Sequence, residues 1–147
     1  MRSFFLGLFW TLLTLNIGWA ANLGAAAPAG SDLAQGQKQI AQKDWKGAVA
    51  TLEKFTKAHP TDAEGFNLLG YSLRNLKRYP EAIQNYQEAL RLDPQHRGAH
   101  EYLGQTYVQL KELDKAQVLL SNLEKICGQS CEQYVDLKKA IDQAEKH

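Results

Sequence analysis

Cys127 and Cys131 are the only cysteines in the chain, and they stand four residues apart. In an oxidising compartment such a pair is expected to form a disulfide, and the short loop it closes would stabilise the fold by about 2 kcal/mol. The chemical alternatives are a thiol–disulfide exchanger and a soft-metal site. An exchanger prefers Cys-x-x-Cys at a helix start, and no histidine or methionine lies near enough in sequence to complete a metal site. The pair therefore favours a structural bridge.

His96 and His100 form a second pair of residues whose spacing is compatible with a chemical role. Four residues apart on one helix, two imidazoles could face a transition-metal ion, but the sequence offers no evident third ligand. We expect His100 to fill a packing position and His96 to be solvated in a turn. The sequence predicts no metal site and no cofactor.

Catalytic motifs are not apparent. No serine lies in a nucleophile elbow or a Ser-x-x-Lys context, and no glycine-rich loop could hold a phosphate. The acidic residues are spread along the expected helices, where the usual environment is solvent. The sequence therefore predicts no catalytic residue and a protein that is not an enzyme. The serines are Ser3, Ser31, Ser72, Ser121 and Ser130.

Two columns of small residues repeat every 34 positions. The first consists of Gly36, Gly70 and Gly104, and the second of Ala48, Ala82 and Ala116. A fixed period of this length is typical of a chain that stacks one helix–turn–helix unit several times. Small residues at fixed positions let two helices cross closely, because a larger side chain would push the backbones apart.

The unit over residues 63–96 carries the most complete pattern. Phe66, Leu69 and Gly70 are expected in its first helix, and a second helix with Ala82 and Tyr86 closes at Pro94. This pattern resembles the tetratricopeptide repeat. The resemblance covers residues 31–128 as three units, over about 31–62, 63–96 and 97–128. The third unit departs at His100, where an aromatic is expected, and at Gly128, where the other units have proline. The first unit places Asp32 and Gln35 in apolar columns.

A last segment, 131–147, places apolar residues at steps of three and four on an otherwise charged helix. These residues are Tyr134, Leu137, Ile141 and Ala144. We expect this helix to cap the exposed end of the third unit, as terminal elements of a repeat stack do. The predicted fold is therefore all-α, a right-handed α-solenoid of three units plus a C-terminal capping helix.

The resemblance implies a concave groove lined by the first helix of each unit, where a protein or peptide would lie. The alternative is an ordinary polar surface in which Tyr71 covers a helix crossing. The lysine–asparagine and basic positions that clamp a C-terminal carboxylate in chaperone-binding repeats correspond here to Leu33, Gln37, Gly98 and Tyr102, so the clamp is absent. The groove residues implied are Leu33, Gln37, Ile40, Glu64, Asn67, Tyr71, Arg74, Glu101, Gln105, Val108 and Gln109.

The N-terminal residues 1–20 have the pattern of a secretory signal peptide. Arg2 precedes a run of about a dozen apolar residues, and small residues at Gly18 and Ala20 offer a cleavage site. An uncleaved membrane anchor is the alternative, since the stretch is nearly long enough to span a bilayer. Residues 21–30 are expected to form a flexible leader. The predicted location is periplasmic or secreted, with no membrane attachment after cleavage.

The charge balance and the expected fold limit the classes of function that the sequence can support. Without Arg2 the chain has 16 basic and 16 acidic residues, and this balance argues against a nucleic-acid partner. The sequence predicts a non-catalytic scaffold or assembly factor of the bacterial envelope that holds a protein or peptide in the groove. Self-association is a further possibility for the same surface. The alternative function is a periplasmic redox or metal-handling accessory that uses Cys127 and Cys131.

Overall fold

A computed structural model describes residues 29–146, which form seven α-helices and no strand. The predicted signal peptide and most of the predicted leader lie outside the described residues. The first helix begins at Ala29, so Ala29 and Gly30 belong to that helix and not to the leader. The helices are α1 (Ala29–Ala41), α2 (Trp45–Ala58), α3 (Ala63–Asn75), α4 (Tyr79–Leu92), α5 (Arg97–Gln109), α6 (Leu113–Cys127) and α7 (Glu132–Ala144).

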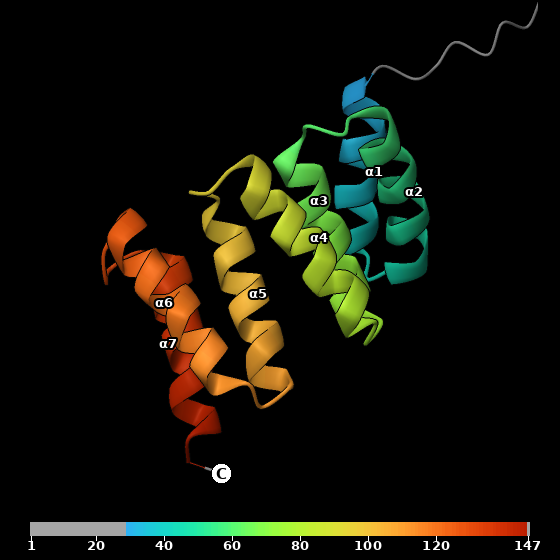
Figure 1. Cartoon of the computed structure of the whole chain (residues 1–147). Coiled ribbons are helices and arrows are strands. Elements are labelled where there is room, and N and C mark those ends of the chain that lie inside the picture. Colours follow the sequence, from blue (N-terminus) through green and yellow to red (C-terminus); the bar gives the residue numbers. More distant parts are fainter. Residues whose placement is uncertain (1–28, 147) are drawn as a thin grey trace, which may run out of the picture.

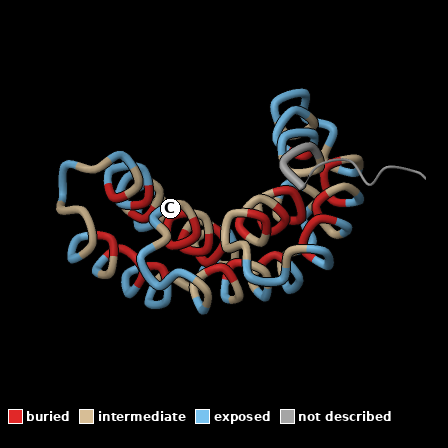
Figure 2. Tube along the Cα trace, turned by 90° about the horizontal axis from the view of Figure 1, so that it is seen from above, coloured by how far each residue is buried: buried red, intermediate tan, exposed pale blue. Residues whose placement is uncertain are grey.

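The helices form three antiparallel hairpins, α1–α2, α3–α4 and α5–α6, and α7 packs against both α5 and α6 (Figure 1). Seen from above, with the helices roughly end-on, the stacked hairpins follow an arc (Figure 2). Within residues 29–146, α1 contacts α3, α3 contacts α5 and α5 contacts α7, whereas α2, α4 and α6 do not contact one another. Neighbouring helices approach on the concave side of a bend, so α1, α3, α5 and α7 are the inner helices and α2, α4 and α6 the outer ones. This is the predicted solenoid with its capping helix.

The glycine column marks the closest helix crossings. A Cβ added at Gly70 would lie 2.8 Å from the Tyr86 ring and 3.2 Å from the Ala82 carbonyl oxygen, and one at Gly36 would lie 2.7 Å from Leu52. At Gly104 the neighbour is Leu137 of α7, at 2.5 Å. The capping helix therefore packs directly over the small-residue position of the third unit.

Two apolar residues and a disulfide hold α7 in place. Leu137 and Ile141 are fully buried. Cys127 ends α6, Cys131 is the residue before α7, and their sulfurs are bonded at 2.03 Å. Gly128, at φ 78°, makes the turn between them. No helix among the described residues has both the length and the apolar character needed to cross a bilayer.

A third column with the same period lies in the turns between paired helices. Lys43, Lys77 and Lys111 have φ of 59°, 61° and 62°, the left-handed region. In the second unit, the Lys77 N–H donates to the Arg74 carbonyl and the Arg78 N–H donates to the Leu73 carbonyl. These bonds are those of a Schellman turn, which usually places glycine at the left-handed position. The left-handed backbone conformation of these three lysines therefore repeats with the same 34-residue period.

Replacing Lys77 by glycine is expected to raise the free energy of unfolding by about 0.5–1 kcal/mol relative to Lys77→Ala. A residue with a Cβ costs about 1–2 kcal/mol in the left-handed region, and the larger backbone entropy of unfolded glycine offsets part of the gain. Both variants remove the same exposed charge, so their difference isolates the backbone. Urea denaturation followed by circular dichroism measures it, and equal stability would contradict the left-handed turn.

Candidate protein-binding groove

The predicted groove residues fall into two groups in the structure. Leu33, Ile40 and Val108 are partly buried and pack against the hydrophobic core, so they mainly hold the helices together. Gln37 and Gln109 are exposed. The remaining six lie on α3 and α5. We call the facing polar and aromatic surface of α3 and α5 the inner wall; its residues are Glu64, Asn67, Tyr71, Arg74, Glu101, Tyr102 and Gln105.

Arg74 connects the two helices of the inner wall. Its Nη1 donates to Gln105 Oε1 at 2.7 Å, and Gln105 Nε2 donates to Glu101 Oε1 at 2.8 Å. The same guanidinium lies over two aromatic rings, 5.3 Å from the centre of Tyr71 and 5.6 Å from that of Tyr102. The orientation of a planar guanidinium is restricted when it contacts two aromatic rings and an amide at once. The centre of the inner wall is therefore ordered before any partner binds.

An aromatic row crosses the units beside Arg74. The rings of Tyr71 and Tyr102 lie 4.9 Å apart between centroids, and Trp45 of α2 meets Tyr71 edge-on at 5.9 Å. From the sequence, Tyr102 was named only as a position of the absent clamp, and Trp45 was missed as a member of this surface. Tyr102 occupies the same repeat position as Leu68, 34 residues earlier. An aromatic residue where the previous repeat has an aliphatic one was the sequence signal that could have identified Tyr102. Aromatic rows with a fixed arginine are common in protein-recognition surfaces.

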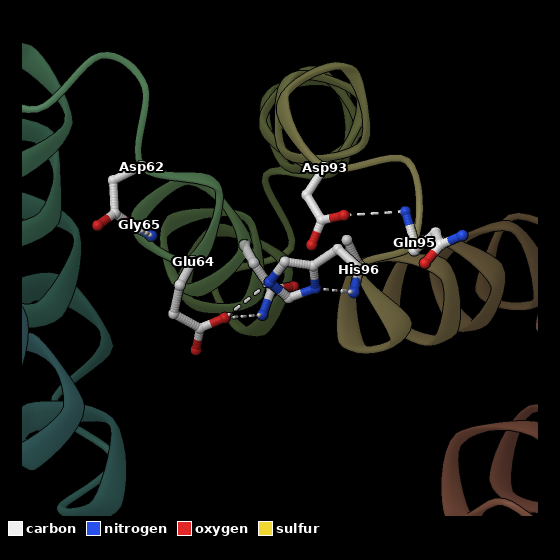
Figure 3. Close-up of polar contacts among 8 residues, drawn as sticks. Asp62, Glu64, Gly65, Asp93, Gln95 and His96 are labelled. Carbon is white, nitrogen blue, oxygen red and sulfur yellow. Dashed lines mark hydrogen bonds and ion pairs between the residues drawn. The ribbon is translucent and has the colours of Figure 1, made fainter. Parts of the chain in front are cut away.

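His96 joins α3 to α5 at the other end of the inner wall (Figure 3). Its Nε2 lies 2.9 Å from Glu64 Oε2, and the Asn67 amide donates to the same carboxylate oxygen at 3.2 Å. His96 Nδ1 accepts from the Ala99 N–H at 3.2 Å, so the imidazole caps α5. Only 15% of the side chain is exposed. The hydrogen bond with Glu64 raises the pKa of His96.

The prediction that His96 is solvated is therefore wrong. The helix cap holds the imidazole against α3, because the ring must face the first turn of α5 to accept its N–H. His100 does occupy a packing position: it is 6% exposed, and its Nε2 lies 2.9 Å from the Pro94 carbonyl oxygen. The two histidines thus have separate structural partners.

Glu101 is a buried carboxyl at the inner wall, with only 7% of the residue exposed. Burial raises its pKa to about 7, and the negative charges of Asp136 and Glu132 on α7 act in the same direction. Arg74 and the hydrogen bond from Gln105 oppose this shift. Sequence reasoning ended the groove at α5 and missed both α7 carboxylates. The capping helix thus contributes to the electrostatics of the surface.

We expect the stability advantage of Glu101→Gln to grow as pH rises. The pKa of Glu101 in the folded state, about 7, lies above its ordinary value of 4.5. The free energy of unfolding of the native chain therefore falls as pH rises from about 4.5 to about 7, and this effect adds nothing further at higher pH. A glutamine keeps an acceptor for Gln105 and has no charge to bury. From pH 5 to pH 8 the variant should gain about 1–2 kcal/mol over the native chain.

Denaturant midpoints at several pH values measure this gain. Glu124→Gln, at an exposed position of α6, is the matched control and should show a constant difference from the native chain. A pH-independent difference for Glu101→Gln would mean that the Glu101 carboxyl is neither buried nor close to the α7 carboxylates.

Two family models described as tetratricopeptide repeat match residues 33–97 and 73–145, which together span almost all of the described chain. The chain belongs to the tetratricopeptide repeat family. No curated protein matches it significantly in sequence.

Solved structures with the same fold include peptide complexes. The TPR2B domain of yeast Sti1, in a complex with pHsp70, has 22% identity and a TM-score of 0.72, covering 80% of this chain and 96% of that one. The first TPR of Spaghetti (RPAP3), bound to the HSP90 peptide SRMEEVD, has 20% identity and a TM-score of 0.71, covering 81% and 94%. MamA from Desulfovibrio magneticus RS-1 has 25% identity and a TM-score of 0.63, covering 65% and 54%. These likenesses establish the fold.

Proposed function

We propose that this chain is an exported, non-catalytic scaffold or assembly factor of the bacterial envelope, and that it holds a partner protein on its inner wall. The observation that carries the proposal is the ordered cluster of Tyr71, Arg74 and Tyr102 across two repeats on the concave side. Aromatic side chains and arginine contribute most of the binding energy in typical protein interfaces. The fixed position of Arg74 lowers the entropy lost when a partner binds.

Two further observations support the finer parts of this proposal. The structures of similar fold include TPR domains in complex with peptides, which supports a protein or peptide as the ligand. The signal-peptide pattern of residues 1–20 and the Cys127–Cys131 disulfide both agree with export to an oxidising compartment.

Site-specific photocrosslinking in living cells tests the proposal. A photoreactive amino acid at Gln37, an exposed inner-helix position one period before Tyr71, is expected to capture a discrete envelope protein. The matched control is Gln87, an equally polar and exposed position on the outer helix α4. Tyr71→Ala combined with Arg74→Ala should abolish the Gln37 adduct.

Three results would contradict the proposal. They are equal capture from Gln37 and Gln87, an adduct that survives the double substitution, and recovery of the protein only from the cytoplasm.

A further inference from the structure

The inner wall carries more negative than positive charge. Glu64 and Glu101 project from α3 and α5, and Glu132 and Asp136 of α7 lie near enough to Glu101 to act on its ionisation. Arg74 is the cation at the centre, and it is already engaged with Gln105 and two tyrosine rings. Arg74 lowers the pKa of Glu101, but burial and the two α7 carboxylates outweigh this effect, so Arg74 does not fully compensate the negative charge of this surface.

A cavity of about 760 Å³ opens in this acidic region, at the N-terminal ends of α3, α5 and α7. Three carboxylates line it, Glu64, Asp93 and Glu132. Two basic groups also line it: His96, which is bonded to Glu64, and Arg97. The lining therefore carries more carboxylates than basic groups, whether or not His96 is protonated. Figure 3 shows Glu64, His96 and Asp93, three of the residues that line this cavity.

Asn67 adds an independent feature to the cavity that it helps to line. The residue is only 3% exposed, and its amide nitrogen donates to Glu64. Its carbonyl oxygen is buried and has no hydrogen-bond partner. Buried amide oxygens are rarely left without a donor, because the unmet bond costs free energy. A ligand with N–H groups could supply that donor beside the carboxylate.

We propose that the cavity between α3, α5 and α7 receives a lysine or arginine side chain of a basic segment in the partner protein. The ammonium or guanidinium would lie between Glu64 and Glu132 and donate to Asn67, while the backbone of the segment follows the row of Tyr102 and Tyr71. This inference rests on the proposed function and specifies the chemistry of the partner.

An acidic ligand fits this surface poorly. The HSP90 peptide bound by the RPAP3 domain, SRMEEVD, contains three carboxylate side chains. On this chain such groups would face Glu64, Glu101 and the α7 carboxylates. Like charges brought together in a partly desolvated groove repel and reject a partner, and this repulsion is a source of specificity.

Fluorescence anisotropy of labelled peptides tests the inference. The probes are flexible glycine–serine peptides that carry lysines, with matched versions that carry glutamate or glutamine at the same positions. At about pH 8 and low ionic strength, where surface charges are least screened, only the lysine peptide should bind the purified protein. Glu64→Gln combined with Glu132→Gln should weaken that binding about tenfold.

A control variant removes the effect of net charge. Asp114→Asn combined with Glu124→Gln deletes two exposed carboxylates from the outer helix α6, and it should change the affinity less than twofold. Protonation of Glu101 and His96 makes the wall less negative, so affinity should also rise severalfold from pH 6 to pH 8. The groups that face Glu101 in this response are Arg74, Gln105, Glu132 and Asp136, and those that face His96 are Glu64 and Asp93.

Equal binding of the three peptides, or equal losses in the two double variants, would overturn the inference. A dimer that dissociates in Glu64→Gln, Glu132→Gln would also overturn it, because a second copy would then occupy the wall. This inference can fail while the proposed function still holds. Capture of an envelope protein from Gln37 would still support a groove scaffold if the lysine peptide failed to bind.

Discussion

Replacing Tyr86 by alanine is expected to lower the free energy of unfolding by about 3–5 kcal/mol. The side chain is fully buried, and its ring fills the space that the missing side chain of Gly70 leaves at the crossing of α3 and α4. The ring also lies 6.4 Å from that of Tyr102 on α5, so it connects two units. Its loss leaves a cavity at a crossing that cannot close without shifting both helices. Guanidinium denaturation followed by circular dichroism measures the change.

Tyr86→Phe is the matched control and separates packing from hydrogen bonding. The Tyr86 hydroxyl is buried without a hydrogen-bond partner, and burial raises its pKa. Removing an unpaired buried hydroxyl is expected to leave stability unchanged or to raise it by up to about 1 kcal/mol. A loss of more than about 1 kcal/mol in the phenylalanine variant would contradict this account, because it would require a partner for the hydroxyl.

Replacing Leu137 by alanine is expected to cost about 2–5 kcal/mol, with the loss concentrated at the C-terminal end of the stack. Leu137 is fully buried and lies against Gly104, so it forms the contact between the capping helix and the third unit. In a repeat stack each unit is stabilised mainly by its neighbours. Weakening the cap should therefore expose α5 and α6 before it affects α1 and α2.

Amide hydrogen exchange measures this loss of stability separately for each helix. Amides of α5, α6 and α7 should exchange faster in Leu137→Ala, while those of α1 and α2 keep native rates. Val135→Ala, on the same helix at a position 49% exposed, is the control and should cost little. Uniform acceleration along the chain, or an equal loss in the Val135 variant, would show that α7 does not act as a local cap.

The helices were predictable because the packing repeats. Gly70 and Tyr86 belong to columns whose spacing sets where helices cross, so the units and the cap follow from the sequence. The left-handed turns were not predictable in the same way, because Lys77 takes a conformation that residues with a Cβ seldom adopt. Only the hydrogen bonds of the complete turn make that conformation evident.

The candidate site was predictable in part. The repeat columns place Tyr71, Arg74 and Glu101 on the inner helices, but column positions do not say which side chains interact. Burial raises the pKa of Glu101, and Asp136 and Glu132, which belong to the cap and not to a repeat, add to this shift. Similarly, the pairing of His96 with Glu64 depends on a helix cap across two units. Contacts between units require the three-dimensional arrangement.

We propose that a partner protein binds the concave side of the arc. Amide hydrogen exchange of the native chain, alone and in complex with the protein captured from Gln37, is the sharpest test of this proposal. We predict slower exchange in α3, α5 and α7, with little change in the outer helices α2, α4 and α6. Protection confined to the outer helices would contradict the proposal, because the partner would then bind the convex face.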